Sequence, residues 1–182
     1  WNVHLDHYRN LFDQTDFLIY FVNSITVAAS ATLLTIVIAT LAAYGITRFR
    51  FTGREYIAGG MLFTYMFAPI LIVVPFYILM KNYGLINTKL GLVLAYTTFS
   101  LPFSMWLLRS FFQSIPLDLE EAAMTDGASR PQAVIRVIVP LAFPGVIAVS
   151  IFTFIVAWND YLFARVLVSD NLMKTLPIGM ND

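Results

Sequence analysis

The chain alternates long apolar stretches with short polar segments. Four runs contain no Asp, Glu, Lys or Arg, and they extend over residues 17–47, 56–80, 90–108 and 137–159. Each run is long enough for an α-helix that crosses a bilayer, which needs about 17 to 25 apolar residues. None shows the two-residue alternation that is typical of outer-membrane strands. The pattern therefore predicts an all-α fold, a polytopic transmembrane helical bundle.

Prolines interrupt three of these runs. Pro69 and Pro75 lie in the second run, Pro102 in the middle of the third, and Pro140 and Pro144 near the start of the fourth. Proline removes a backbone donor and its ring clashes with the preceding turn. We therefore expect the second helix to be bent or broken. Such a break fits two interpretations, ordinary kinked packing or a carbonyl-lined wall of a water-filled path.

Composition and charge agree with a membrane protein. Hydrophobic residues make up 59% of the chain and charged residues 12%, whereas soluble domains carry about 25% charged residues. The net charge of zero gives no basic surface for nucleic acid, and the absence of cysteine excludes disulfides and thiolate metal sites. His4 and His7 are three residues apart, but we interpret them as separate surface histidines and predict no metal site.

The chain ends and the arginines suggest an orientation. Residues 1–16 are predicted to be an amphipathic flank on the extracytoplasmic membrane surface, and residues 17–182 the transmembrane domain. Because the chain begins without methionine and ends in a polar segment, we expect it to be a piece of a longer protein. Three arginines between residues 48 and 54 favour the cytoplasm for that loop. Alternation then places 81–89 outside and 109–136 inside.

A compact charged block, EEAAMTDGASRPQAVIRV, lies between the third and fourth runs. Pro116 suits the first turn of a helix, and the acidic residues after it stabilise the positive end of the helix dipole. Gly127 stands where a helix end uses a residue with positive φ. The spacing of Ser129 and Gln132 is that of a capping box. The block therefore predicts a helix, a glycine turn and a second helix.

The first of these helices has a small apolar face. Leu119, Ala122 and Ala123 share that face, since they are spaced by three and four positions. Helices that lie on lipid usually carry basic residues and bulky apolar anchors, whereas this helix is acidic and its face is mostly alanine. Two interpretations stay open, a connector on the membrane surface and a segment on which another protein docks, and the alanines favour the second.

The same block resembles the EAA loop of inner-membrane permease subunits of ATP-binding-cassette (ABC) importers. The motif consists of Glu121, Ala122, Ala123, Gly127, Val137, Val139 and Pro140. The family more often has Ile and Leu at positions 137 and 139. Other stretches resemble the maltose-type, carbohydrate-uptake branch: Asn23-Ser24, Ala43-Tyr44, Arg48 to Phe51, Gly84-Leu85, Asn87-Thr88 and Trp158-Asn159-Asp160. The resemblance covers nearly the whole chain and implies the core of a permease, a fragment of about four to five spans.

The resemblance implies that residues 116–140, here called the EAA segment, are cytoplasmic and act as a coupling helix. This helix would sit in a cleft of a separate nucleotide-binding ATPase subunit. ATP would be used by that partner, so this chain would bind no cofactor directly and would not be an enzyme. In agreement, the sequence contains no H-E-x-x-H, G-x-S-x-G or phosphate-binding glycine motif, and no catalytic residue is predicted. The expected ATPase-docking residues are Glu120, Glu121, Ala122, Ala123, Asp126 and Gly127.

The resemblance also implies further partners and a setting. They are a second permease subunit, expected to make a heterodimer, and an extracytoplasmic solute-binding protein, periplasmic or on the cell surface. The setting is the cytoplasmic (inner) membrane of a bacterium or archaeon, which the chain would cross several times. The implied solute is a sugar, either a mono- or oligosaccharide or a related polyol.

Two alternatives to sugar import stay open, a permease for another small solute and an ion-coupled secondary transporter. The second usually places ionisable groups within the membrane, and the four runs contain none. Aromatic rings and amides suit sugars, although each such residue can equally serve packing or interface anchoring. The candidate solute-path residues are Asn23, Tyr77, Trp106, Trp158 and Asn159.

Overall fold

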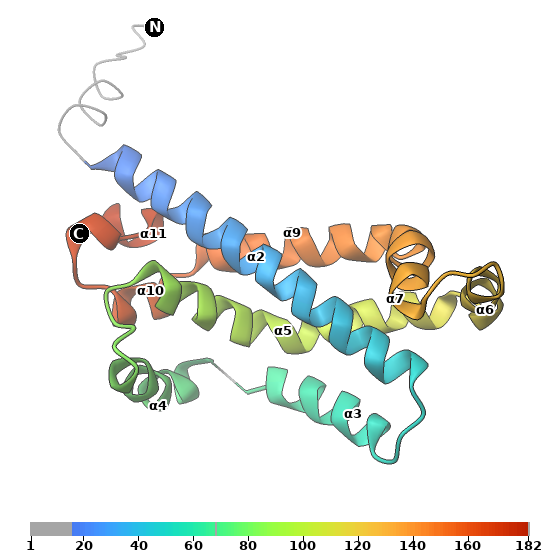
Figure 1. The fold of residues 1–182 in the computed structure, drawn as a ribbon. Coiled ribbons are helices and arrows are strands. Elements are labelled where there is room, and N and C mark those ends of the chain that lie inside the picture. Colours follow the sequence, from blue (N-terminus) through green and yellow to red (C-terminus); the bar gives the residue numbers. More distant parts are fainter. Residues whose placement is uncertain (1–15, 68, 182) are drawn as a thin grey trace, which may run out of the picture. The chain divides into compact units, whose positions relative to one another are not determined.

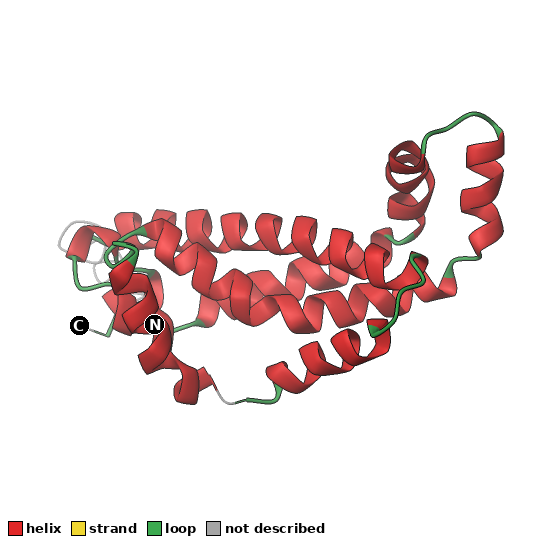
Figure 2. Cartoon of the chain, turned by 60° about the horizontal axis from the view of Figure 1, so that its bottom comes forward, coloured by secondary structure: helices red, strands yellow, loops and turns green. Residues whose placement is uncertain are grey.

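A computed structural model of the chain describes residues 16–67 and 69–181. Within these residues every regular element is a helix and there is no strand, so the predicted all-α class is confirmed (Figure 1, Figure 2). The expected surface flank over residues 1–16, with His4 and His7, lies outside the described part of the chain except for Asp16.

The charge-free runs correspond to the long helices. α2 (Phe17–Arg48) and α5 (Lys89–Ser114) are each continuous and apolar enough to cross a membrane. The second run forms α3 (Arg54–Tyr65) and α4 (Pro69–Asn82), and most of the fourth forms α9 (Phe143–Asn159). If each interrupted pair of helices counts as one span, the described residues hold up to four spans, which agrees with the number of runs.

The remaining helices are short. They are α6 (Leu117–Thr125), α7 (Arg130–Ala133), the π-helix η1 (Val134–Ile138), α8 (Val139–Leu141), α10 (Leu162–Leu167), the 3₁₀-helix η2 (Asn171–Met173) and α11 (Leu176–Gly179). The first four of them make up most of the EAA segment.

The prolines act in different ways. The predicted break in the second run lies before Pro69, which opens α4 where a first turn needs no backbone donor. Pro75 and Pro102 lie inside α4 and α5. Pro140 is the second residue after the π-helix, and Arg130–Leu141 is bent by 74° from α9. Proline has no N–H for a carbonyl four residues earlier and its ring crowds that turn, so a wider π-turn accommodates it.

The described residues form two compact units, each described here by itself. Unit 1 contains the described residues up to Ala31 together with those of Ala68–Tyr96 and Phe154–Asp182. Unit 2 contains Thr32–Phe67 and Thr97–Thr153. The helices α2, α5 and α9 contribute residues to both units.

The core of unit 2 combines small residues of α2 with larger residues of α5. Its buried members include Ala39, Ala43, Met105, Leu108, Phe112, Ile138 and Val149. Small side chains let helix backbones approach closely. At Gly145 of α9 an added Cβ would lie 2.5 Å from the ring of Phe111, so α9 passes close to α5 there.

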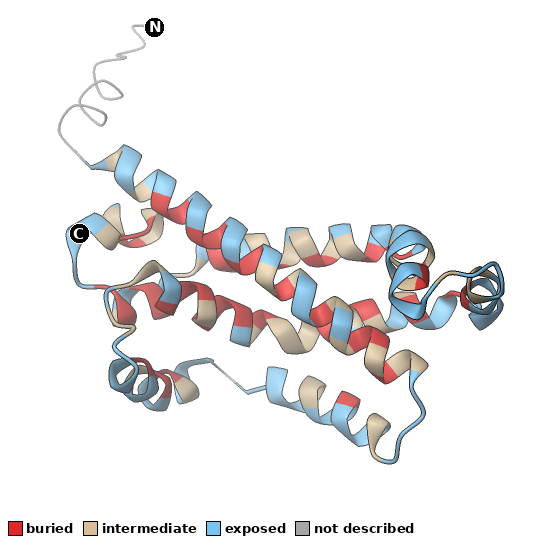
Figure 3. Cartoon of the chain, in the orientation of Figure 1, coloured by how far each residue is buried: buried red, intermediate tan, exposed pale blue. Residues whose placement is uncertain are grey.

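The long helices also expose large apolar side chains. Along α2, buried positions follow one side of the helix (Figure 3), while Leu33 and Leu41 on other sides are 66% and 65% exposed. On α9, Ile151 is 55% exposed. A continuous apolar exterior of this kind suits contact with lipid or with neighbouring spans.

Candidate functional site

The EAA segment has the predicted local structure. α6 begins after Pro116, and Gly127 follows its end with a φ of 93°. The backbone amide of Ser129 donates to Oε1 of Gln132 at 2.9 Å, as expected of the capping box, and α7 begins at Arg130. Figure 2 shows the two helical parts of the segment beside one another, joined by one loop. Helix, glycine turn and second helix are therefore confirmed.

The six predicted docking residues divide into an accessible group and one buried residue. Five of them are at least partly exposed and are here called the EAA face: Glu121, Ala122, Ala123, Asp126 and Gly127. Glu120 is only 3% exposed. Since a protein partner can contact only the accessible residues, the structure separates Glu120 from its neighbours in the motif.

Glu120 lies in a buried charge cluster at the end of α2. Oη of Tyr44 donates to Oε1 of Glu120 at 2.5 Å, and Nε of Arg48 lies 3.2 Å from Oε2. The side chains of Arg48 and Glu120 are 5% and 4% exposed. Nη2 of Arg48 also donates to the carbonyl of Ile115 at 3.1 Å. Because a buried charge without a partner is costly, these contacts hold α6 against α2.

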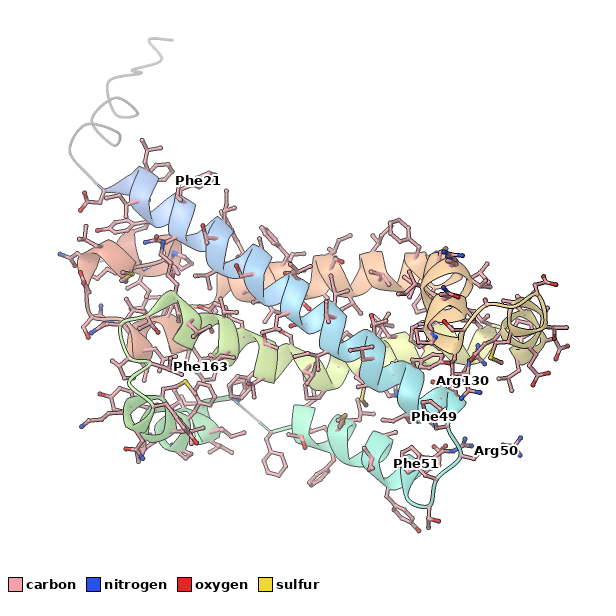
Figure 4. All side chains as sticks on the ribbon, in the orientation of Figure 1. Phe21, Phe49, Arg50, Phe51, Arg130 and Phe163 are labelled. Carbon is pink, nitrogen blue, oxygen red and sulfur yellow. The ribbon has the colours of Figure 1, made fainter. Side chains whose placement is uncertain are left out.

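Arg130 approaches the same carboxylate from α7. Its Nε lies 3.9 Å from Oε1 of Glu120, and its guanidinium carbon lies 5.3 Å from the ring centre of Phe49. Figure 4 shows Arg130 beside Phe49 at the end of α2. The Arg130 side chain is 50% exposed, so solvent weakens this contact. We call Tyr44, Arg48, Glu120 and Arg130 the Glu120 cluster.

A hollow of about 330 Å³ opens between α6 and the second helical part of the segment. Its walls are Ala123, Asp126, Gly127, Ala128, Gln132, Ala133, Arg136 and Val137. Three residues of the EAA face are among them. The hollow gives a partner protein room to insert a side chain beside the EAA face.

Of the candidate solute-path residues, the structure brings two together. Trp158 and Asn159 line a hollow of about 230 Å³ in unit 1, whose other walls are Ile25, Phe154 and Ile155. The Trp158 ring also stacks on that of Phe154, with centroids 5.8 Å apart. Nδ2 of Asn159 donates to the carbonyl of Ile155 at 2.9 Å. A tryptophan face beside an amide is a combination that can contact a sugar.

Asn23 serves the packing of unit 1. It is 3% exposed, and its Nδ2 donates to the carbonyls of Leu172 and Lys174 at 2.9 and 3.0 Å. The two hydrogens of the amide nitrogen are therefore used within the protein. The neighbouring Ser24 accepts a hydrogen bond on Oγ from the amide of Leu176 at 2.7 Å. These contacts favour the packing interpretation for Asn23.

Tyr77 and Trp106 are not among the walls of the Trp158 hollow. Tyr77 is half-buried on α4 in unit 1. Trp106 belongs to unit 2, where it is 40% exposed and its ring centre lies 6.1 Å from that of Phe103. Of the four candidates in unit 1, only Trp158 and Asn159 therefore share a hollow.

Asn87 has a structural role that the sequence did not assign. It has a left-handed φ of 57°, a conformation that asparagine tolerates better than most residues. Its Oδ1 accepts hydrogen bonds from the amides of Ser169 and Asp170 at 2.6 and 3.2 Å, and its own amide donates to the carbonyl of Leu167. Asn87 thus fastens the chain after α10, and the turn-forming NYGLINT stretch around it was the available signal.

Asp160 is a second anchor without an assigned role from sequence. Its Oδ2 accepts hydrogen bonds from the amides of Phe163 and Ala164 in the first turn of α10, and from Oη of Tyr96, each at 3.1 Å. Burial raises the pKa of Asp160, while the hydrogen bonds from Ala164, Tyr96 and Phe163 lower it in part. Asp160 lies two residues before α10, and an aspartate that accepts hydrogen bonds from first-turn amides stabilises the start of a helix.

Residues 35–181 match the family described as "Binding-protein-dependent transport system inner membrane component". The chain is 40% identical over 179 residues to "Inner membrane ABC transporter permease protein YcjP" of Escherichia coli (strain K12), which covers 97% of this chain and 64% of that protein. It is 38% identical to "Trehalose/maltose transport system permease protein MalG" of Thermococcus litoralis, again over 97% of this chain and 64% of the relative. The chain therefore spans just under two thirds of these relatives.

Another relative and a solved structure agree. "Trehalose transport system permease protein SugB" of Mycobacterium tuberculosis is 39% identical over 98% of this chain and 65% of its own length. A similar chain occurs in the crystal structure of a bacterial ABC transporter involved in the import of the acidic polysaccharide alginate. The two chains superpose with a TM-score of 0.84 and are 25% identical. The match covers 98% of the present chain and 61% of the chain in the crystal structure.

Proposed function

Because the chain belongs to the family of binding-protein-dependent transport system inner membrane components, we propose that it is the central part of a permease subunit of an ATP-driven importer. Members of this family are inner-membrane transport components. The described helices α2 and α5 are long and apolar enough to span that membrane. We place it in the cytoplasmic membrane of a bacterium or archaeon, with the EAA segment on the cytoplasmic side.

The EAA face is the proposed docking site for a separate nucleotide-binding ATPase subunit. The observation that carries this proposal is the contrast within α6, where Glu120 is buried at 3% exposure while Glu121 and Ala122 next to it are exposed. Buried contacts of Glu120 hold α6 against α2, and the EAA face stays accessible. ATP is used by the partner, and this chain binds no cofactor itself.

The docked segment works only if the partner holds it differently in two states. A ligand shifts an equilibrium by no more than its differential affinity for the two conformations. ATP binding therefore has to change the contacts that the ATPase subunit makes with α6. The resulting displacement opens the path through the spans to one side of the membrane or the other.

A sugar is the proposed solute. The names of similar proteins refer to trehalose, to trehalose and maltose, and to diacetylchitobiose. An extracytoplasmic solute-binding protein would deliver the sugar, and a second, unlike permease subunit would complete the path. In this chain we propose Trp158 and Asn159 as contacts, since they line one hollow together. The second candidate is an anionic glycoside, because another relative is named for sulfoquinovosyl glycerol.

The docking proposal is tested with the complete subunit that contains this chain. Capture of candidate ATPase subunits during purification is compared between wild type, Glu121→Lys and Gly127→Val. The first variant reverses a charge on the EAA face, and the second places a branched side chain at a φ of 93°. We expect capture to weaken about tenfold in each, which corresponds to ~1.4 kcal/mol. Undiminished capture and transport in both would contradict the proposal.

The energy source is tested separately by uptake into vesicles. ATP enclosed with the assembled transporter should drive accumulation of the sugar, and an ion gradient without ATP should not. Accumulation driven by the gradient alone would favour an ion-coupled secondary transporter instead.

A further inference from the structure

Glu120 and Glu121 are adjacent acidic residues in opposite surroundings. Glu121 is exposed, whereas Glu120 is 3% exposed and contacts Tyr44 and Arg48 of α2. We infer that Glu120 is the positioning residue through which displacement of α6 is passed to α2, while Glu121 belongs to the surface that the ATPase subunit touches. This inference rests on the proposed function, because it concerns how a displacement of α6 by the ATPase subunit reaches the rest of the permease.

The contacts of Glu120 make α6 and the end of α2 move together. Oε1 of its carboxylate accepts a hydrogen bond from the hydroxyl of Tyr44, and the guanidinium of Arg48 lies near Oε2. Both contacts are buried. Separating the two helices would break the contact between a buried carboxylate and a buried guanidinium, which is unfavourable. A displacement of α6 that keeps these contacts therefore carries the last turns of α2 with it.

Arg48 also holds the chain just before α6. Its Nη2 donates to the carbonyl of Ile115, the residue that precedes Pro116. One side chain at the last residue of α2 thus contacts both the residue before Pro116 and the first turn of α6. α6 has little freedom to rotate about its first residue without loss of one of these contacts.

Tyr44 continues the route into the core of unit 2. Its ring is 7% exposed and meets the ring of Phe112 edge-on at 6.5 Å, and Phe112 is fully buried on α5. The neighbouring Ala43 is also fully buried. Interiors packed at this density transmit strain rather than absorb it. The hydroxyl of Tyr44 therefore connects the buried carboxylate to the packing between α2 and α5.

Through its carboxylate, Glu120 is linked more weakly to α7 than to α2. Arg130 lies 3.9 Å from the carboxylate and is 50% exposed, against 3.2 Å and 5% for Arg48. Water competes for an exposed guanidinium. We therefore expect the Glu120 carboxylate to pass a displacement of α6 to α2 more strongly than to α7.

The contact between Arg48 and Glu120 depends on charge. Nε and Oε2 lie 3.2 Å apart without the alignment of a hydrogen bond. Glu120→Gln keeps the size of the side chain and removes the charge, so it loosens the pair without opening a cavity. Glu121→Gln makes the same chemical change at the exposed neighbour and is the matched control.

The two variants are compared in the assembled transporter, reconstituted into proteoliposomes with its ATPase subunit. For Glu120→Gln we expect capture of the ATPase subunit close to that of wild type and a fall in solute transported per ATP hydrolysed of about fivefold or more, the size of a typical coupling effect. Glu121→Gln should weaken capture, while the complexes that do form keep the wild-type ratio. A wild-type ratio in Glu120→Gln would overturn the inference.

Tyr44→Phe decides the case where Glu120→Gln fails to assemble. It removes only the hydroxyl that donates to Glu120, and the ring keeps its place against Phe112. We expect about a twofold to threefold lower transport per ATP with normal assembly, and an unchanged ratio would overturn the inference. If wild type itself neither captures an ATPase subunit nor uses ATP, the proposed function fails, which is distinct from failure of the Glu120 route alone.

A tether supplies a further readout that a merely structural role would not produce. These 182 residues contain no cysteine. Tyr44→Cys with Glu120→Cys is therefore made in a complete subunit from which any other cysteine has been removed, so that it introduces one defined pair. The pair should transport poorly per ATP, and a short thiol-to-thiol linking reagent should restore the ratio. A single-headed thiol reagent should not restore it. No gain on linking would contradict a route from α6 to α2.

Discussion

The two units fasten their peripheral chain segments by different means. In unit 2, α6 is held to α2 through one buried carboxylate that contacts Tyr44 and Arg48. In unit 1, residues 167–174 are held by neutral groups, since Asn23 and Asn87 bond to backbone atoms of this stretch. Charge is concentrated on one residue in the first case, and hydrogen bonds are spread over several residues in the second.

This difference predicts how each segment responds to change. A neutral hydrogen bond contributes about 0.5 to 1.5 kcal/mol, and its loss is local. A buried ion pair contributes little as a whole, but removal of one partner costs about 3 to 5 kcal/mol because the other charge stays buried. The segment in unit 2 can therefore be released by a single substitution, whereas the segment in unit 1 is released in steps.

The largest effect is expected for Glu120→Ala. It leaves Arg48, which is 5% exposed, without its carboxylate, so we expect a loss of about 3 to 5 kcal/mol of stability. The thermal midpoint of the purified subunit in detergent should fall clearly below that of Glu121→Ala, whose side chain is exposed. Equal midpoints for the two variants would show that the cluster does not fasten α6.

A smaller effect is expected at Asn23. Asn23→Ala removes two hydrogen bonds to carbonyls at a buried position, and we expect a loss of about 1 to 3 kcal/mol. Asn23→Asp should be worse than Asn23→Ala, because it turns a carboxylate toward those carbonyls. Hydrogen exchange should speed up over residues 168–178 and stay unchanged over the EAA segment. Exchange that rises equally in both regions would contradict separate fastening.

Asp160 is a partly buried carboxylate in unit 1, and its substitution gives a further test. Asp160→Ala removes the acceptor of two amides in the first turn of α10 and should cost about 0.5 to 2 kcal/mol, while Asp160→Asn keeps an acceptor oxygen and should cost less. Because burial raises the pKa of Asp160 in the folded protein, folding is favoured by protonation, and this contribution is lost as pH rises through the folded pKa. The stability of wild type relative to Asp160→Asn should therefore improve as pH is lowered. A relative stability that worsens instead would reverse the assigned cause.

The smallest effect is expected for Glu55→Gln in unit 2. Glu55 pairs with Arg109 at 2.6 Å, which is shorter than any contact of Arg48 with Glu120, but its side chain is 62% exposed. The Arg109 side chain is 14% exposed, but water reaches the Glu55 carboxylate, and contacts of exposed charges contribute little and are screened by salt. The midpoint should move less than for any variant above, and added salt should not change that ranking. A large fall in the midpoint would mean that the charges of an ion pair stabilise this protein whether or not they are buried.

The local structure of the EAA segment and the family could be predicted from sequence. Pro116, Gly127 and the Ser129–Gln132 spacing are short-range signals, and each acts through the residues next to it. The four charge-free runs predicted the helices in the same way. The predicted resemblance to ABC importer permeases is confirmed by the family match over residues 35–181.

The difference in burial between Glu120 and Glu121 could not be predicted. Both have the same chemistry and adjacent positions, and the difference comes from Tyr44, which is 76 positions earlier in the chain. The five solute-path candidates were chosen by residue type alone, so nothing in the sequence separated buried Asn23 from the hollow that Trp158 and Asn159 share. Long-range packing decided each of these outcomes.

The π-helix Val134–Ile138 makes the number of residues in this stretch important. A π-turn accommodates one residue more than an α-turn, and successive residues of an α-helix are about 100° apart around its axis. Deleting one residue there would restore regular winding and rotate the chain before it by roughly that angle. Exchange of this stretch between permeases should therefore tolerate changes of side chain far better than a change in the number of residues.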